Sequence, residues 1–246
     1  MALYGVAKRT HWIGVALLLI SSLLLLVTTI SAPILKDVAF LHVILTNKTE
    51  IRNSSVTFGT LGYCILDVPP VQTDQDWCSK RHVGYEPADI MAKIDKTSFS
   101  EIAAGTSDGL TRVMVLHPVA CGLAFVAFLC SIGAGVIGSL VGAFAAFVAW
   151  ILVLISLAVD FSLFGILRHH VNTDKSGSQA KFGSAIWILL ASFVTLFLGM
   201  LIVFFTCCSA RREKKRGGVG VKNEGYPPAQ STAGAGGPRK KRFGLF

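Results

Sequence analysis

Two cysteines in a long polar segment between apolar stretches are the residues best placed to form a covalent link. Cys64 closes the sequence Phe58-Gly59-Thr60-Leu61-Gly62-Tyr63-Cys64, and Cys78 follows after thirteen intervening residues. Outside a membrane such thiols meet an oxidising compartment, where disulfides persist, and closing a loop of this length is worth about 3 kcal/mol. The alternatives are two free thiols or part of a metal site, although zinc needs more ligands than His82 alone would add. We therefore predict a Cys64–Cys78 disulfide.

Asp160 is the only acidic residue within a predicted membrane span. A carboxylate at the centre of such a helix costs about 2.5–3.5 kcal/mol on insertion scales, but Asp160 lies near the outer end of its span, where the cost is smaller. Its side chain either makes a polar contact with another span, the outer domain or a partner's helix, or reaches water at the interface. No second membrane charge lines up with it, which argues against a proton or ion path.

Histidine side chains titrate near neutral pH and can therefore sense it. Histidines on an outer surface are more often ordinary surface residues, so the sequence favours that interpretation over sensing by this chain. Five of the six lie on or near the predicted outer side, namely His42, His82, His117, His169 and His170.

A second cysteine pair, Cys207 and Cys208, ends the last apolar stretch directly before a basic cluster. Juxtamembrane cysteines beside basic residues are typical palmitoylation sites, and two ordinary buried thiols are the alternative. The basic cluster stops transfer of the chain through the membrane, and it can also bind anionic lipids at about 1 kcal/mol per residue. Its members are Arg211, Arg212, Lys214, Lys215 and Arg216.

The composition around these residues is typical of a membrane protein. Of the 246 residues, 52% are hydrophobic and 15% are charged, whereas soluble domains carry about 25% charged residues. The segment from Met114 to Val159 contains no Asp, Glu, Lys or Arg. Because one helix needs only about 20 apolar residues to cross the hydrocarbon, this segment must hold two helices. We place the turn between them near Gly138–Gly142, since glycine breaks helices.

This pattern predicts a membrane α-helical protein. The expected fold is a four-transmembrane-helix bundle with a small disulfide-linked extracellular α/β domain between spans 1 and 2. The first apolar stretch is longer than the core of a cleaved signal peptide, so we expect it to be kept as a span. The predicted segments are a cytoplasmic N-terminus at 1–11, spans at 12–34, 117–138, 141–164 and 184–208, extracellular loops at 35–116 and 165–183, and a disordered basic cytoplasmic tail at 209–246.

The distribution of charge predicts the orientation. The tail after Cys208 carries ten basic and two acidic residues, whereas the loop from Leu35 to Arg112 carries eight basic and ten acidic residues. The positive-inside rule therefore places both termini in the cytoplasm. Asn47 and Asn53 agree, because each begins an Asn-x-Ser/Thr glycosylation sequence that is used only on the outer side. Most of the net charge of +9 lies in the tail, facing lipid, so we expect no nucleic-acid partner.

The outer loop contains both strand and helix patterns. Val38–Leu45 and Ser55–Phe58 are rich in apolar and β-branched residues and predict strands, whereas Asp67–Asp76 predicts a loop. From Pro87 onward, apolar residues recur at helical spacing and predict a short amphipathic helix. The second outer loop, 165–183, is short and polar.

Motifs for catalysis or cofactor binding are absent from the sequence. There is no Gly-x-Ser-x-Gly elbow, no His-Glu-x-x-His motif, no phosphate-binding loop and no Gly-rich dinucleotide fingerprint. Asp160 has no companion base or nucleophile. We therefore expect a protein that is not an enzyme and that holds no metal or cofactor.

Several short motifs resemble the fungal PalI family of membrane proteins, and the resemblance covers about residues 10–210. Many members of that family carry long low-complexity tails, whereas the tail of this sequence is short, so a function that depends on such a tail is not expected. The motifs are Gly59-x-x-Gly62-Tyr63-Cys64, Cys78-Ser79, Gly84-Tyr85-Glu86, His117-Pro118-Val119-Ala120 and Val159-Asp160-Phe161-Ser162-Leu163-Phe164.

The resemblance implies a four-span plasma-membrane protein distantly similar to claudins. It implies a non-enzymatic accessory role in ambient-pH signalling, in which the protein assists or stabilises a seven-span pH sensor of the PalH kind. Relatives that organise eisosomes imply an alternative, a structural organiser of plasma-membrane domains that acts by lateral self-association as a homo-oligomer. In that alternative, the basic tail and acylated cysteines would select the lipid environment.

Overall fold

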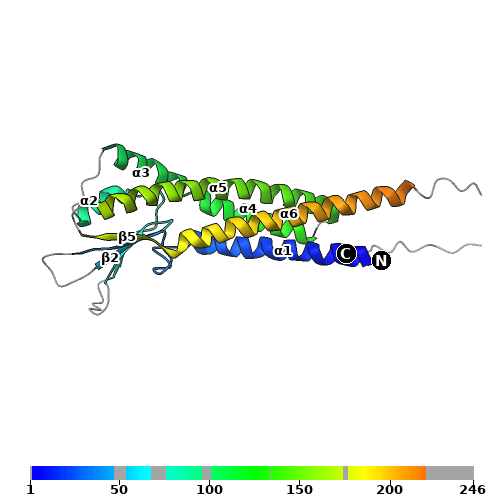
Figure 1. The fold of residues 1–246 in the computed structure, drawn as a ribbon, viewed down its shortest axis with the longest axis horizontal. Helices are drawn as coiled ribbons and strands as arrows, with labels where there is room; N and C mark the ends of the chain where they lie inside the picture. Colours follow the sequence, from blue (N-terminus) through cyan, green and yellow to red (C-terminus); the bar gives the residue numbers. More distant parts are fainter. Residues whose placement is uncertain are drawn as a thin grey trace, which may run out of the picture.

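Long helices run side by side and carry a small sheet at one end of the molecule (Figure 1). The structure is a computed structural model that describes residues 2–46, 54–67, 76–95, 101–133, 135–173 and 177–219. Four of the described helices are long and apolar enough to cross a membrane. They are α1 (Ala2–Thr29), α4 (Leu116–Gly133), α5 (Gly135–Thr173) and α6 (Ser184–Val219).

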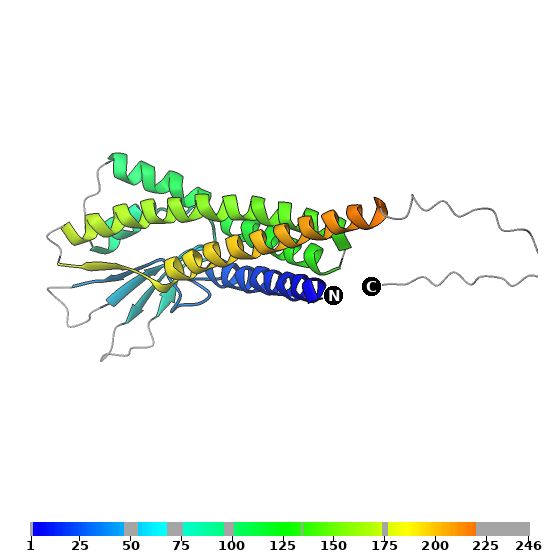
Figure 2. The ribbon, with the colours of Figure 1, turned by 45° about the vertical axis from the view of Figure 1, so that its right-hand side comes forward.

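The four helices pack as a closed ring. α1 lies against α4 and α6, and α5 lies against the same two helices. Small residues such as Ala124, Ala127 and Ala146 are fully buried where the helices meet, which lets the backbones approach closely. The start of α1 and the end of α6 lie at the end of the bundle opposite the sheet (Figures 1 and 2).

The turn between the second and third spans lies earlier than the sequence predicted. α4 ends at Gly133 and α5 begins at Gly135, so the predicted turn at Gly138–Gly142 falls within α5. A Cβ atom at Gly142 would lie 2.9 Å from the carbonyl oxygen of Ala127 on α4. This glycine therefore allows close packing of α5 on α4 and does not end a helix.

Five antiparallel strands form the sheet in the order β4-β3-β2-β1-β5. The first two strands confirm the predicted ones, although β1 is shorter than the predicted segment. β5 comes from the segment 165–183, where no strand was predicted, so the domain at the sheet end is not built from the first loop alone. We call this domain the outer domain, after the side of the membrane that the sequence predicts for it. The strands are β1 (Leu41–Ile44), β2 (Ser54–Phe58), β3 (Tyr63–Asp67), β4 (Trp77–Cys78) and β5 (Gln179–Phe182).

Two short helices complete the outer domain. α2 (Pro87–Asp95) is the predicted amphipathic helix, and its Met91 is fully buried. α3 (Glu101–Val113) leads into α4 and packs against α5.

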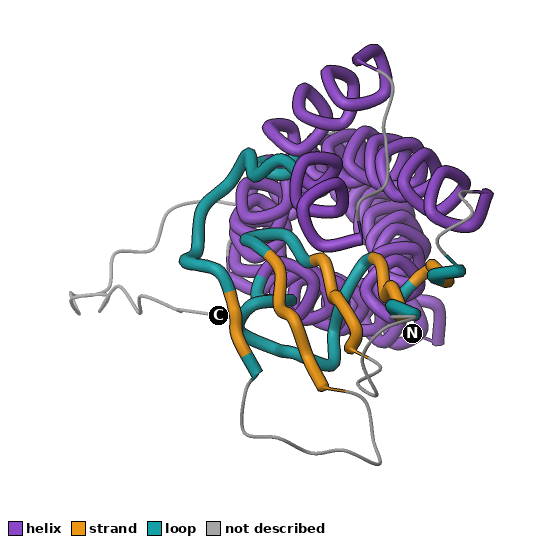
Figure 3. The backbone as a smooth tube through the Cα atoms, turned by 90° about the vertical axis from the view of Figure 1, so that its left-hand side faces the viewer, coloured by secondary structure: helices purple, strands orange, loops and turns teal. Residues whose placement is uncertain are grey.

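One hydrophobic core runs from the bundle into the outer domain. Leu18 and Leu25 of α1, Phe58 of β2 and Phe164 of α5 belong to the same buried cluster. Seen from the sheet end, the strands lie against the ends of the helices (Figure 3). The sheet is therefore packed onto the bundle and is not held only by its connecting loops.

Candidate functional site

The turn between β2 and β3 is fastened to the end of α1. The Gly59 N–H donates to the Gly62 carbonyl at 2.8 Å and closes the turn. Within it, the Thr60 N–H donates to Ser31 Oγ at 3.0 Å, and the Thr60 hydroxyl donates to the Thr28 carbonyl at 2.8 Å. All three polar side chains are buried. The Gly-x-x-Gly-Tyr-Cys motif therefore joins the outer domain to the first span.

Gly59 and Tyr85 form the centre of this joint. A Cβ atom at Gly59 would collide with the backbone of Ala32, so only glycine fits. The Tyr85 hydroxyl donates to the Gly59 carbonyl at 2.7 Å, and the ring stacks on Phe58 with centroids 6.2 Å apart. Burial, and then the charge of Asp160, raise the pKa of Tyr85 above its ordinary value. The hydroxyl is therefore protonated and donates across the normal pH range.

The predicted disulfide is present. Cys64 on β3 lies directly opposite Cys78 on β4, and the two residues are bonded. Cys64 is fully buried, and the carbonyl of its neighbour Tyr63 accepts the Ser79 N–H at 2.9 Å. The bond therefore fixes the edge of the sheet next to the turn that holds α1.

The remaining motifs meet at a buried pair between the second and third spans. His117 lies in the first turn of α4 and Asp160 lies in α5, and His117 Nε2 is 3.0 Å from Asp160 Oδ2. The side chains are 1% and 0% exposed. Of the alternatives that the sequence left open for Asp160, the structure shows a polar contact with another span. The sequence-based search for a second membrane charge had not counted His117. The two residues lie near the ends of adjacent antiparallel spans that are closer to the sheet, and so at one depth, which is the signal that could have paired them.

The hydrogen bonds of His117 show how many protons the pair holds. A carbonyl oxygen only accepts, so His117 Nδ1 carries a hydrogen and donates it to the Met114 carbonyl at 3.1 Å. One further proton lies between Nε2 and the Asp160 carboxyl group. The pair is neutral overall wherever that proton sits, which is the arrangement that costs least in an apolar setting. Among the described residues, Asp160 Oδ1 has no hydrogen-bond partner.

Phe40 connects this pair to the sheet. Its ring meets the His117 ring edge-on at 5.5 Å and stacks on Phe164 at 5.5 Å. The Phe40 N–H donates to the Phe58 carbonyl at 2.8 Å, and the Phe40 carbonyl accepts from the Gly183 N–H at 2.8 Å. The chain segment that carries Phe40 therefore links the intramembrane pair to β2 and to the start of α6.

The other predicted site residues lie away from this junction. Cys207 is buried and Cys208 is half-buried in α6, in the half of that helix farther from the sheet. The basic cluster falls in the last turns of α6, and its side chains lie outside the described residues. Asn47 and Asn53 also lie outside the described residues. His42 is on β1, His82 follows β4, and His169 and His170 are in the last turns of α5.

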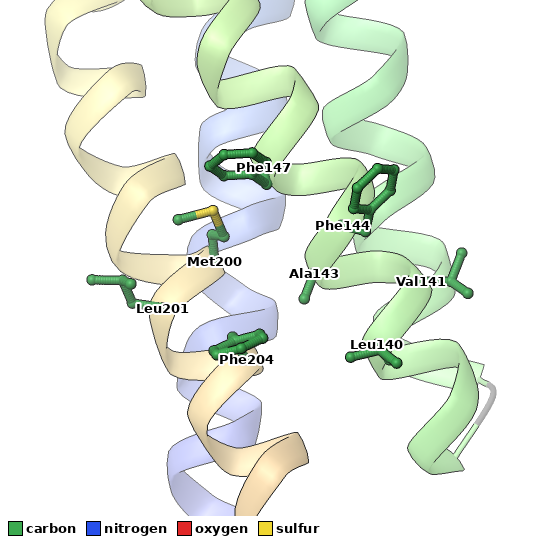
Figure 4. Close-up of a pocket in the computed structure, with 8 residues that line it drawn as sticks. All are labelled: Leu140, Val141, Ala143, Phe144, Phe147, Met200, Leu201 and Phe204. Carbon is green, nitrogen blue, oxygen red and sulfur yellow. The ribbon is translucent and has the colours of Figure 1, made fainter.

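An apolar groove opens between α5 and α6 (Figure 4). It encloses about 710 Å³, and its walls include Phe144, Met200 and Phe204. Toward the sheet the two helices are closed together by Trp150, which packs on Phe193 at 5.3 Å. Phe144 is 69% exposed, so this groove opens on the outside of the helix bundle.

Comparison of the sequence with known protein families identifies the family of this chain. The profile of the SUR7/PalI family matches residues 10–199, which include the whole outer domain, the second and third spans and most of the first and fourth. The chain belongs to the SUR7/PalI family. Every motif that joins the outer domain to the bundle lies within the matched range.

Two curated relatives are similar over part of their length. The chain is 28% identical over 111 residues to the pH-response regulator protein palI/RIM9 of Pyricularia oryzae, which is 45% of this chain and 13% of that protein. It is 27% identical over 108 residues to the uncharacterized membrane protein TOS7 of Saccharomyces cerevisiae, which is 44% of this chain and 16% of that protein. The similarity therefore covers less than a fifth of either relative's length.

Proposed function

We propose that this protein is a non-enzymatic plasma-membrane accessory protein of ambient-pH signalling that assists or stabilises a seven-span pH sensor of the PalH kind. The observation that carries the proposal is the similarity to a pH-response regulator within a family that matches most of the chain. The His117–Asp160 contact is consistent with it, because the two side chains are bonded to each other inside the fold.

The junction between outer domain and bundle suits such a role. Tyr85, Phe40 and the His117–Asp160 pair hold the sheet against the helix ends. A partner that contacts either the sheet or the helix faces therefore meets a single rigid body. An accessory protein that stabilises a partner needs a preformed surface, because ordering that surface during binding would cost affinity.

The lateral groove favours a second candidate function. An apolar groove lined by Phe144 and Phe204 offers a seat for a helix of another chain in the membrane. If that chain is a second copy, the protein is an organiser of eisosome-type plasma-membrane domains that acts by lateral self-association. This alternative needs immobile patches and an oligomer, whereas the accessory role needs a different partner protein.

In both functions we place the termini in the cytoplasm and the sheet outside the cell. The tail cluster from Arg211 to Arg216 then faces anionic lipid headgroups. Cys207 and Cys208 lie at the same membrane surface, where palmitoylation would add to lipid selection.

The test is the location of a tagged seven-span sensor in cells that lack this gene. The accessory role predicts retention of the sensor inside the cell and poor growth at alkaline pH, both restored by the wild-type chain. Normal delivery of the sensor contradicts that role. The organiser role predicts instead that photobleached patches of the tagged protein fail to recover, and that Phe144→Ala makes them recover faster.

A further inference from the structure

A polar cleft opens on the outer domain between the β3–β4 hairpin and α2. It has a volume of about 410 Å³, which falls in the lower part of the range of ligand sites, roughly 300–1,000 Å³. The cleft belongs to the sheet end of the molecule and so lies beyond the membrane spans. Its walls include Tyr63, Trp77, Ser79, Glu86, Asp89 and Lys93.

Trp77 presents a fixed aromatic surface to this cleft. The side chain is 53% exposed, yet its backbone pairs with Ile65 and the next residue is bonded to Cys64. The Tyr63 ring supports the indole at 5.6 Å. A ring held in this way loses little conformational entropy when a ligand stacks on it.

The aromatic surface continues into the core. Tyr63 lies 6.3 Å from the Tyr85 ring, which stacks on the buried Phe58. Tyr85 is held by its hydrogen bond to Gly59. The aromatic platform formed by Trp77 and Tyr63 is therefore connected through Tyr85 to the turn that joins the sheet to α1. The rings are therefore a preformed part of the fold.

The polar groups around the platform have no dominant sign of charge. Lys80 and Lys93 donate hydrogen bonds, whereas Glu86 and Asp89 accept them. His82 uses Nδ1 against the Lys80 carbonyl at 2.8 Å, so Nε2 is the nitrogen left to face a ligand. A strongly anionic or cationic ligand would meet as much repulsion as attraction here. The arrangement suits a neutral ligand with one apolar face and many groups that both donate and accept.

A pyranose ring has this chemistry. Its axial C–H groups form an apolar face that stacks on an indole, and its hydroxyl groups lie around the edge. We propose that the cleft binds a neutral saccharide chain, with one sugar ring stacked on Trp77 and its hydroxyl groups bonded to Asp89, Glu86 and the lysines. This site goes beyond the proposed role in pH signalling and does not depend on it.

The test measures binding by the full chain reconstituted in lipid nanodiscs, because sugar-headed detergents would compete for the site. Neutral oligosaccharides of glucose, mannose and N-acetylglucosamine are titrated by calorimetry. We expect saturable binding that Trp77→Ala weakens at least about tenfold, as truncation of a central aromatic anchor does. The matched control is Trp187→Ala, since Trp187 is 59% exposed but lies in α6 away from the cleft, and it should bind normally.

A second variant keeps the test valid if Trp77→Ala fails to fold. Asp89→Asn keeps the shape of the side chain and should weaken binding several-fold, while non-reducing gels report the Cys64–Cys78 bond in every variant. Preference for glucose or N-acetylglucosamine chains would assign a surface polysaccharide, and preference for mannose chains a protein-linked glycan. The proposal is overturned if no oligosaccharide binds, if both variants bind as the wild type does, or if a photocrosslinker at position 77 captures a protein without saccharide binding.

Discussion

Asp160 and His117 depend on each other because each neutralises the other in an apolar site. Removing one partner leaves a buried polar group without its bond, whereas removing both leaves only apolar surroundings. Because the side chains are in contact at 3.0 Å, we expect the effects of the two substitutions on stability to be non-additive.

We predict that His117→Leu and Asp160→Leu are each destabilising by about 3–5 kcal/mol, and that the double variant recovers most of the loss. The measurement is the thermal unfolding midpoint of the chain in micelles, for the two single variants and the double. Additive losses in the double variant would show that the two side chains act independently.

His42 makes the sheet sensitive to acid. Burial, and then the neighbouring Lys181, lower the pKa of His42 below its ordinary value of 6.5, and Lys181 lies directly across the strand pair from it. In the window below pH 6.5 the unfolded chain therefore binds more protons than the folded chain. The stability that the neutral imidazole provides is present above pH 6.5 and is lost as the pH falls.

We predict that amide protection in β1 and β5 decreases from pH 7 to pH 5, and that His42→Gln removes this pH dependence. Hydrogen exchange on the reconstituted chain measures it strand by strand. The region around His82, which is exposed, serves as the internal reference. An unchanged acid response in His42→Gln would assign the effect to another group.

At the scale of elements, the turn between β2 and β3 depends on close backbone approach. We predict that Gly59→Ala disrupts the joint to α1 and prevents delivery to the cell surface, because the added Cβ would collide with Ala32. Gly165→Ala is the matched control, since a Cβ there meets nothing within 4 Å. Surface labelling of the two variants compares them directly, and equal delivery would show that the backbone shifts to make room.

The sequence predicted those parts of the fold that follow from local pattern. Span number, the first two strands, the amphipathic helix and the disulfide come from hydropathy, residue type or cysteine spacing. β5 was missed because the strand has only four residues, Gln179–Phe182, and its strand form depends on pairing with β1. Asn172 supports it on the other side, because its side chain accepts the Ala180 N–H at 2.7 Å and donates to the Ala180 carbonyl.

The site was harder to predict than the fold, because its contacts join residues that are far apart in the sequence. In the sequence, His117 is one of five histidines on or near the predicted outer side, and Asp160 was left with either a polar contact or water as its surroundings. Nothing in the residues around either one identifies the other as its partner. The helix turn was misplaced because Gly142 resembles a helix breaker in sequence, although its role is to admit the backbone of α4.

At the scale of the whole molecule, the start of α1 and the end of α6 lie at the end opposite the sheet. With the basic cluster after the last span, this arrangement predicts cytoplasmic termini and an outer sheet. We expect glycosidase treatment to increase the gel mobility of the wild type, and Asn47→Gln together with Asn53→Gln to abolish that shift. Tags at both termini should be labelled only after the cells are permeabilised. A tag labelled on intact cells would reverse the orientation.

Completion of the sheet by β5 sets an order of assembly during synthesis. β1 and β2 leave the ribosome early, but β1 has its second neighbour only after two further spans have been inserted and Gln179–Phe182 has followed them across the membrane. Until then the outer domain carries an open strand edge, which is the kind of surface that quality-control factors retain. A chain cut short after its third span would therefore be held back at the site of synthesis, even with its disulfide formed.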